Sequence, residues 1–185
     1  MTGDELSVAA VTRGDLAAVA AMVNRAYRGA AARRGWTHEA DLLDGQRTDP
    51  ASLADELDAP EPSTLLTLRA GPGGPILGCV MMQRYRDDAE RPLCHLAMLT
   101  VDPDHQRAGL GARLIAEVER RARDEGCVAV EMTVIALRTE LLAFYGRRGY
   151  RPTGATKPFP QDDARFGRPR RDDLGFLVIE KALAP

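Results

Sequence analysis

The sequence predicts an α+β fold, in which a mixed, mostly antiparallel central sheet is flanked by helices. Three runs of β-compatible residues, at 64–69, 76–85 and 93–101, follow one another with only short polar or glycine- and proline-rich turns between them. Such spacing is typical of antiparallel strands. A strongly periodic helix follows at about 109–124, and 185 residues fit one domain that spans positions 1–185.

The N-terminal third predicts a strand and two helices. Residues 6–11 form a short apolar run, and Thr12 with Asp15 resembles a capping box that opens a helix ending near Arg28. Apolar residues recur along this helix at helical spacing: Leu16, Val19, Val23 and Tyr27. Residues 32–39 show no period and predict a loop or short helix. Asp49 is placed to cap a second helix that has Pro50 at its first position.

The C-terminal third predicts a strand at 127–134, a helix at 138–148 and a closing strand at 174–181. Residues 153–171 are long for a connection inside a compact domain. Long loops of this kind are often functional or mobile, so we interpret the stretch as a lid or a dimer contact.

Composition excludes several classes of protein. The formal net charge of −2 disfavours a nucleic-acid binder, and no apolar stretch approaches the roughly 20 residues that span a bilayer. The first residues lack the features of a signal peptide, so we expect a cytoplasmic protein.

The cysteines and histidines do not predict a metal centre. Cys79, Cys94 and Cys127 are far apart and are expected to be reduced thiols, while the three histidines lack metal-ligand spacing. We expect no metal.

The most informative segment, residues 99–111, is a strand that turns into a helix through a loop containing Gly109 and Gly111. Such a junction directs free backbone N–H groups and the positive end of the helix dipole at one spot, which suits a pyrophosphate. A Cβ at either glycine would keep phosphate oxygens away from these donors. A dinucleotide-binding fingerprint is disfavoured because its third glycine position is occupied by Leu114, and there is no Walker loop.

Two motifs make a resemblance specific. Residues 106–111, Gln-Arg-Ala-Gly-Leu-Gly, match the GNAT acetyltransferase signature Arg/Gln-x-x-Gly-x-Gly/Ala at the expected strand-to-helix position. Residues 143–150, Ala-Phe-Tyr-Gly-Arg-Arg-Gly-Tyr, are similar to the Phe-Tyr-x-x-x-Gly-Phe block of that superfamily. The chain therefore resembles a GNAT N-acetyltransferase along nearly its whole length.

The resemblance implies a site for acetyl-CoA as cosubstrate. It places the pyrophosphate on Gln106, Arg107, Ala108, Gly109, Leu110, Gly111 and Ala112. The strand Leu99, Thr100 and Val101 would lie along the pantetheine arm, with the backbone groups of Leu99 and Val101 pairing with it, because the family splays this strand from the next. Tyr145 would lie near the sulfur. Arg138 and Leu141 depart from the commonest family residues, so no contact is assigned to their side chains.

In the implied direct transfer, a backbone N–H near Val101 stabilises the oxyanion and Tyr145 donates toward the leaving sulfur. Deprotonating the amine costs about 1 kcal/mol for an α-amine and about 4–5 kcal/mol for a lysine-like amine at neutral pH. Glu131, His95 and Glu39 are candidate bases, although each also suits a structural or surface position.

These observations predict an enzyme that acetylates a primary amine of a small molecule, peptide or protein. The alternative is a non-catalytic module that binds acetyl-CoA and reports its level to a partner, and transfer of a longer acyl chain is a third reading. Residues 36–48, with Trp36, are a candidate wall of the acceptor site. An edge strand and the long final loop leave room for a homodimer.

Overall fold

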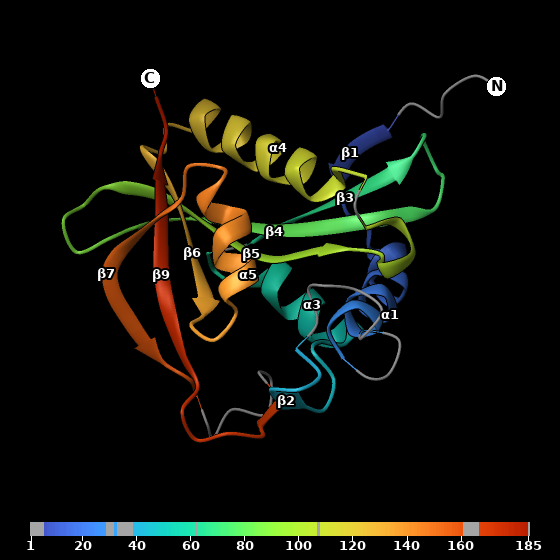
Figure 1. Cartoon of the computed structure of the whole chain (residues 1–185). Helices are drawn as coiled ribbons and strands as arrows, with labels where there is room; N and C mark the ends of the chain where they lie inside the picture. Colours follow the sequence, from blue (N-terminus) through green and yellow to red (C-terminus); the bar gives the residue numbers. More distant parts are fainter. Residues whose placement is uncertain are drawn as a thin grey trace.

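The structure is a computed structural model that describes residues 6–28, 32, 39–61, 63–106, 108–160 and 167–184. Its main feature is a seven-stranded sheet in the order β1-β3-β4-β5-β6-β9-β7 (Figure 1). The pairings are antiparallel apart from β5 with β6, which is parallel, so the predicted fold class is confirmed. The strands are β1 (Leu6–Ala10), β3 (Thr64–Ala70), β4 (Ile76–Arg86), β5 (Pro92–Val101), β6 (Ala129–Ile135), β7 (Arg151–Pro158) and β9 (Gly175–Ala182).

Helices cover both faces of the sheet. Helices α1 (Leu16–Tyr27) and α3 (Pro50–Asp58) pack on one face, and α4 (Leu110–Asp124) and α5 (Thr139–Gly146) on the other (Figure 1). Successive side chains of a strand point to opposite faces, and β3 shows this directly. Leu65 packs in the cluster below α1, whereas Leu66 packs in the cluster below α4.

The side chains that the sequence predicts as caps form hydrogen bonds just before α1 and at the start of α3. The Asp15 carboxylate accepts from the backbone N of Thr12 at 3.2 Å and from its hydroxyl at 2.6 Å, just before α1 begins. Asp49 accepts from the backbone N of Ser52 at 2.9 Å and so caps α3, with Pro50 at the first position. Both predicted helix starts are confirmed.

The parallel strands β5 and β6 are paired only where they begin. Their register runs from Leu93 opposite Ala129 to His95 opposite Glu131, and beyond it the strands separate. Within β5, Met98 has a φ of 50°, and the register with β4 shifts so that Met98 and Leu99 lie opposite the single residue Val80. This β-bulge changes the direction of the strand beyond it. The sheet therefore opens into a wedge at the end of β5.

One prediction for the C-terminal region is wrong. Residues 153–171 are not a single irregular connection, because residues 151–158 form the edge strand β7, which pairs with β9. All eight residues of β7 are exposed and include two prolines and a glycine, so no apolar alternation marks this strand. A short strand β8 (Arg168–Pro169) also pairs with β2 (Leu43–Asp44). None of the described helices is long and apolar enough to cross a membrane.

Candidate functional site

Two cavities meet where β5 and β6 separate. The smaller, of about 220 Å³, lies between the start of α4 and helix α5. The larger, of about 450 Å³, lies between β5, β6 and the segments around Glu39 and Phe159. Both cavities are lined by the same five residues, Tyr27, Leu99, Arg138, Leu141 and Tyr145. The two cavities are therefore adjacent, and these five residues form the wall that they share.

The start of α4 forms one wall of the smaller cavity. Gly109 is the N-cap of α4 and has a φ of 74°, a left-handed conformation that favours glycine. A Cβ added at Gly111 would lie 3.7 Å from the Val101 side chain and 3.8 Å from the Phe144 ring, so it would fill part of the cavity. The first N–H groups of a helix have no partner within the helix and point along its axis. This wall therefore carries backbone donors and the positive end of a dipole.

The structure brings together most of the residues predicted to bind the cosubstrate. Seven line the smaller cavity: Leu99, Val101, Gln106, Gly109, Leu110, Gly111 and Ala112. Thr100 and Ala108 are not among its lining residues. Thr100 is buried in the core, where its hydroxyl donates to the Met98 carbonyl at 3.0 Å. Arg107 lies outside the described residues. The side-chain amide of Gln106 donates to the Val101 carbonyl at 3.3 Å, which ties the loop to the end of β5.

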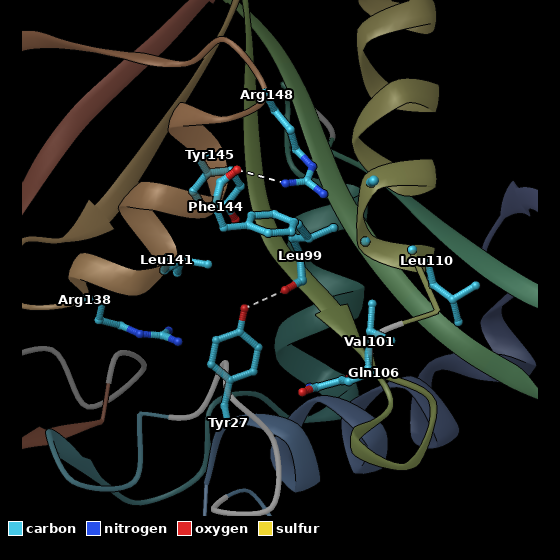
Figure 2. A pocket seen from close by; sticks show the side chains of 13 residues that line it. Tyr27, Leu99, Val101, Gln106, Leu110, Arg138, Leu141, Phe144, Tyr145 and Arg148 are labelled. Carbon is cyan, nitrogen blue, oxygen red and sulfur yellow. Dashed lines mark hydrogen bonds between the residues drawn. The ribbon is translucent and has the colours of Figure 1, made fainter.

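Helix α5 and the turn after it provide the facing wall. Arg148 lies across the cavity from the start of α4 (Figure 2). Its Nη1 donates to the Phe144 carbonyl at 2.9 Å, and its guanidinium carbon lies 3.6 Å from the centroid of the Phe144 ring. The Nε atom of Arg148 is buried and has no hydrogen-bond partner in the described part of the chain. Burial and then the neighbouring Arg147 lower the pKa of Arg148 below its ordinary value.

Sequence reasoning missed this contribution of Arg148, although residue 148 lies inside the quoted motif. It also assigned no contact to Arg138 and Leu141, which line both cavities. Tyr27 was interpreted as part of the apolar stripe of α1. The one available signal was its hydroxyl at the last residue of that helix, where an apolar side chain would have sufficed for packing.

Tyr145 and Tyr27 lie at the junction of the cavities. Tyr145 is 5% exposed, and burial first, then the nearby Tyr27, raises its pKa above the ordinary value for tyrosine. The Tyr27 hydroxyl donates to the Leu99 carbonyl at 2.9 Å (Figure 2). Burial, followed by the Glu39 carboxylate, raises the pKa of Tyr27. Both phenols therefore remain protonated and act as hydrogen-bond donors at neutral pH.

His95 and Glu131, two of the candidate bases, are neighbours across β5 and β6. His95 lines the larger cavity, and its Nδ1 lies 4.0 Å from Oε1 of Glu131. That carboxylate oxygen also lies 3.9 Å from Nζ of Lys157. Burial, with a smaller effect of the Lys157 ammonium, lowers the pKa of His95 to about 4. The imidazole is therefore neutral at neutral pH, and Glu131 lies behind it rather than on the cavity wall.

Glu39, the third candidate base, lines the larger cavity between two guanidinium groups. Its Oε2 is 2.6 Å from Nη1 of Arg28, and its Oε1 is 3.5 Å from Nη1 of Arg138. All three side chains are at most 13% exposed. Both carboxylate oxygens of Glu39 therefore already face a guanidinium group.

The segment predicted to border the acceptor, 36–48, and the stretch 153–171, interpreted as a lid or a dimer contact, both contribute to the larger cavity. Leu43 and Arg47 come from the stretch 36–48, and Phe159 and Pro160 come from the C-terminal stretch. Trp36 lies outside the described residues.

Comparison with known proteins gives matches along most of the chain. Residues 29–150 match the model of the family described as the acetyltransferase (GNAT) family. The N-acetyltransferase Eis of Mycobacterium tuberculosis is 32% identical over 110 residues, which cover 57% of this chain and 26% of that protein. An uncharacterized N-acetyltransferase of Escherichia coli is 32% identical over 129 residues, covering 68% of this chain and 62% of that one. The chain spans about a quarter of the length of the first curated relatives it matches.

Solved structures share the fold. An acetyltransferase of Salmonella typhimurium, solved with its cofactor acetyl-CoA, superposes with a TM-score of 0.64. The two sequences are 19% identical, and the match covers 98% of this chain and 95% of that one.

Proposed function

Because the chain belongs to the GNAT family of acetyltransferases, we propose that it transfers the acetyl group of acetyl-CoA to a primary amine, by direct attack in a ternary complex. The observation that carries this proposal is the pair of cavities that share Tyr27, Leu99, Arg138, Leu141 and Tyr145. A donor in one cavity and an acceptor in the other would bring their reacting ends to the same residues. Such an arrangement requires no covalent enzyme intermediate.

The smaller cavity has the chemistry that the diphosphate of coenzyme A needs. Backbone donors and the helix dipole at Gly109 to Ala112 form one wall, and the buried, unpartnered Nε of Arg148 belongs to the other. The space beside Gly111 depends on the absence of a Cβ. These residues therefore fit the group, and the Salmonella structural neighbour was solved with acetyl-CoA. When bound, acetyl-CoA supplies the acetyl group as a thioester.

The separated part of β5 would position the pantetheine arm. From Leu96 onward β5 pairs with no described strand on its β6 side, so backbone groups of Leu99 and Val101 are available to a ligand. The Leu99 carbonyl already accepts from Tyr27, and a carbonyl oxygen has two lone pairs. The backbone N–H groups at this end of β5 are the donors we assign to the oxyanion.

Tyr145 would stabilise the leaving thiolate by donating a hydrogen bond. Burial raises its pKa, so complete transfer of its proton to sulfur is less favourable than it would be for an exposed tyrosine. A hydrogen bond that strengthens as charge develops on sulfur still lowers the barrier. The acceptor amine must reach the site unprotonated or lose its proton on the larger-cavity side. There, neutral His95, backed by Glu131, is a candidate to accept the proton directly or through water.

The test is release of the coenzyme A thiol from acetyl-CoA, measured across a panel of amines with wild type and Tyr145→Phe. We expect amine-dependent release in wild type and a roughly hundredfold lower kcat in the variant, with acetyl-CoA affinity retained. An unchanged kcat would remove Tyr145 from the mechanism. Binding of acetyl-CoA without release for any amine would favour the sensor alternative.

A further inference from the structure

Cations outnumber carboxylates around the larger cavity. Its described lining residues include three cationic side chains, Arg47, Arg138 and Lys157, and one carboxylate, Glu39. Glu39 is already engaged by Arg28 and by Arg138, and Arg28 is only 6% exposed. The lining carboxylate is therefore compensated before any ligand enters.

The next carboxylate, Glu131, does not reverse this balance. It lies 3.9 Å from Lys157 and 4.0 Å from His95, behind the cavity wall. Taken together, Arg28, Arg47, Arg138 and Lys157 exceed Glu39 and Glu131 by two positive charges. Lys157 is 57% exposed, whereas Arg28 and Arg138 are at most 9% exposed, so the two buried cations act on a ligand more strongly than charges on an open surface would.

Arg47 has no ion-pair partner among the described residues. It is half-buried, and its backbone N donates to the side-chain oxygen of Asn24 at 2.6 Å, which fixes its place beside α1. Its guanidinium carbon lies 5.9 Å from the centroid of the Tyr27 ring. Arg47 therefore brings an uncompensated positive charge to the wall of the cavity.

Arg138, the N-cap residue of α5, also lies near Tyr27. Figure 2 shows its side chain extending toward Tyr27. The two guanidinium groups act together on the Tyr27 phenol, since each favours its ionised form. Arg138 lies 3.5 Å from Glu39 in an ion pair, and its side chain is 9% exposed. Two guanidinium groups thus flank the junction at which the acetyl group would be delivered.

Part of the wall of the larger cavity is apolar. Leu43, Ile135, Phe159 and Phe176 belong to one hydrophobic cluster and line this space. The rings of Phe159 and Phe176 are stacked with centroids 5.5 Å apart. This apolar part of the wall suits an uncharged side chain.

From this juxtaposition we propose that the acceptor is an α-amino acid with an apolar side chain, whose carboxylate is held by Arg47 and Arg138 while its α-amine faces the thioester. The inference rests on the proposed acetyl transfer and specifies its substrate class. Guanidinium groups suit a carboxylate because they match it with paired N–H donors.

The experiment compares each amino acid with its own amide, in which the α-amine and the side chain are kept and the carboxylate is replaced by an uncharged group. Rates of coenzyme A release are measured for L-leucine, L-phenylalanine and L-methionine, for the three corresponding amino acid amides, and for spermidine. The amide has the less basic amine, so intrinsic reactivity favours it, and any preference for the acid reports recognition of the carboxylate. We expect kcat/KM to be at least about tenfold higher for each acid than for its amide, which corresponds to about 1.4 kcal/mol.

Variants of Arg47 test the source of that preference. Arg47→Gln should remove most of it, Arg47→Glu should invert it, and Arg47→Lys should keep part of it, because lysine retains the charge but not the paired N–H donors. Arg123→Glu changes the net charge by the same amount as Arg47→Glu, at an exposed position of α4, and should leave the preference unchanged. The Gln and Lys variants keep the test valid if charge reversal prevents folding.

The outcomes separate this inference from the proposed function. Faster acetylation of the amides or of spermidine than of the acids would overturn the inference and leave acetyl transfer standing. An acid preference that survives in Arg47→Gln would also overturn the assignment. No release with any amine, despite acetyl-CoA binding, would remove the proposed function and the inference with it.

Discussion

The hydroxyl of Tyr27, at the end of α1, donates a hydrogen bond to the carbonyl of Leu99, on the bulged part of β5. This bond ties a helix on one face of the sheet to the strand that borders both cavities. Leu99 follows the bulge residue Met98, whose φ of 50° is unusual for a residue other than glycine. Tyr27 therefore supports a strained segment of backbone at the place where the two substrates would meet.

Tyr27→Phe should lower the free energy of unfolding by about 1 kcal/mol, because the Leu99 carbonyl loses its donor. Urea unfolding of the two proteins measures the difference. Thr67→Val is the comparison, since the Thr67 hydroxyl makes only a 3.4 Å contact with the Ala9 carbonyl and should matter less. Equal stability of Tyr27→Phe and wild type would show that the bulge does not depend on this bond.

Gly109→Ala should destabilise the protein by about 1 kcal/mol, because alanine is strained at a φ of 74° although no atom lies within 4 Å of the added Cβ. We also expect weaker acetyl-CoA binding, since the strain acts on the helix start that carries the donors. Gly146→Ala is the matched control. The φ of Gly146 is not positive, and a Cβ added there also has no described atom within 4 Å. The Gly146→Ala variant should therefore be as stable as wild type or more stable by up to about 1 kcal/mol. Thermal unfolding and calorimetric titration with acetyl-CoA distinguish the two. Equal effects at both positions would contradict the role of backbone conformation at residue 109.

Glu119→Ala should cost about 2–4 kcal/mol of stability, because Glu119 is 6% exposed and is bound by Lys181 at 2.7 and 2.8 Å and by the Tyr150 hydroxyl at 3.1 Å. The substitution leaves the Lys181 ammonium without its carboxylate. Arg120→Ala, one residue along α4, removes ion pairs to Glu117 and Asp124 in which the Arg120 side chain is 53% exposed, and should change stability much less. Chemical denaturation of both variants checks the prediction, and a smaller loss for Glu119→Ala than for Arg120→Ala would refute it.

His95 should make stability depend on pH between about 6.5 and 4. Its pKa in the folded protein is lowered to about 4 by burial and by Lys157, whereas an unfolded histidine titrates near 6.5. In this range the unfolded chain binds more protons than the folded one, so stability falls as the pH falls. Carboxylates titrate in the lower part of this range as well, so the informative quantity is the difference between wild type and His95→Gln. That difference should change in favour of the variant as the pH is lowered from 6.5 to 4. A constant difference would show that His95 titrates normally in the folded protein.

The sequence was sufficient to predict the order of the large elements because each has its own periodic pattern. Helix α4 keeps Leu110, Leu114 and Val118 on one buried face, and β3 to β5 are separated by turns that only antiparallel strands allow. The motif at 106–111 located one wall of the smaller cavity for the same reason, since local geometry at a helix start depends on local residues.

Features that depend on contacts distant in sequence could not be predicted. Strand β7 is held by backbone pairing with β9 and buries none of its side chains, so its composition resembles that of a loop. The Arg28–Glu39–Arg138 group joins Arg138 to two residues about 100 positions earlier in the chain, and none of the three belongs to a local pattern. The bulge at Met98 arises from its register with β4, which the residues of β5 alone do not reveal.

The most direct test of the central claim is transfer of an isotope-labelled acetyl group from acetyl-CoA to an amine, followed by mass spectrometry of the amine. The account predicts labelled product that forms only with enzyme and acceptor together and that declines when coenzyme A competes for the smaller cavity. Saturable binding of acetyl-CoA with no label in any amine would contradict acetyl transfer, and absence of binding would contradict the assignment of the cavity itself.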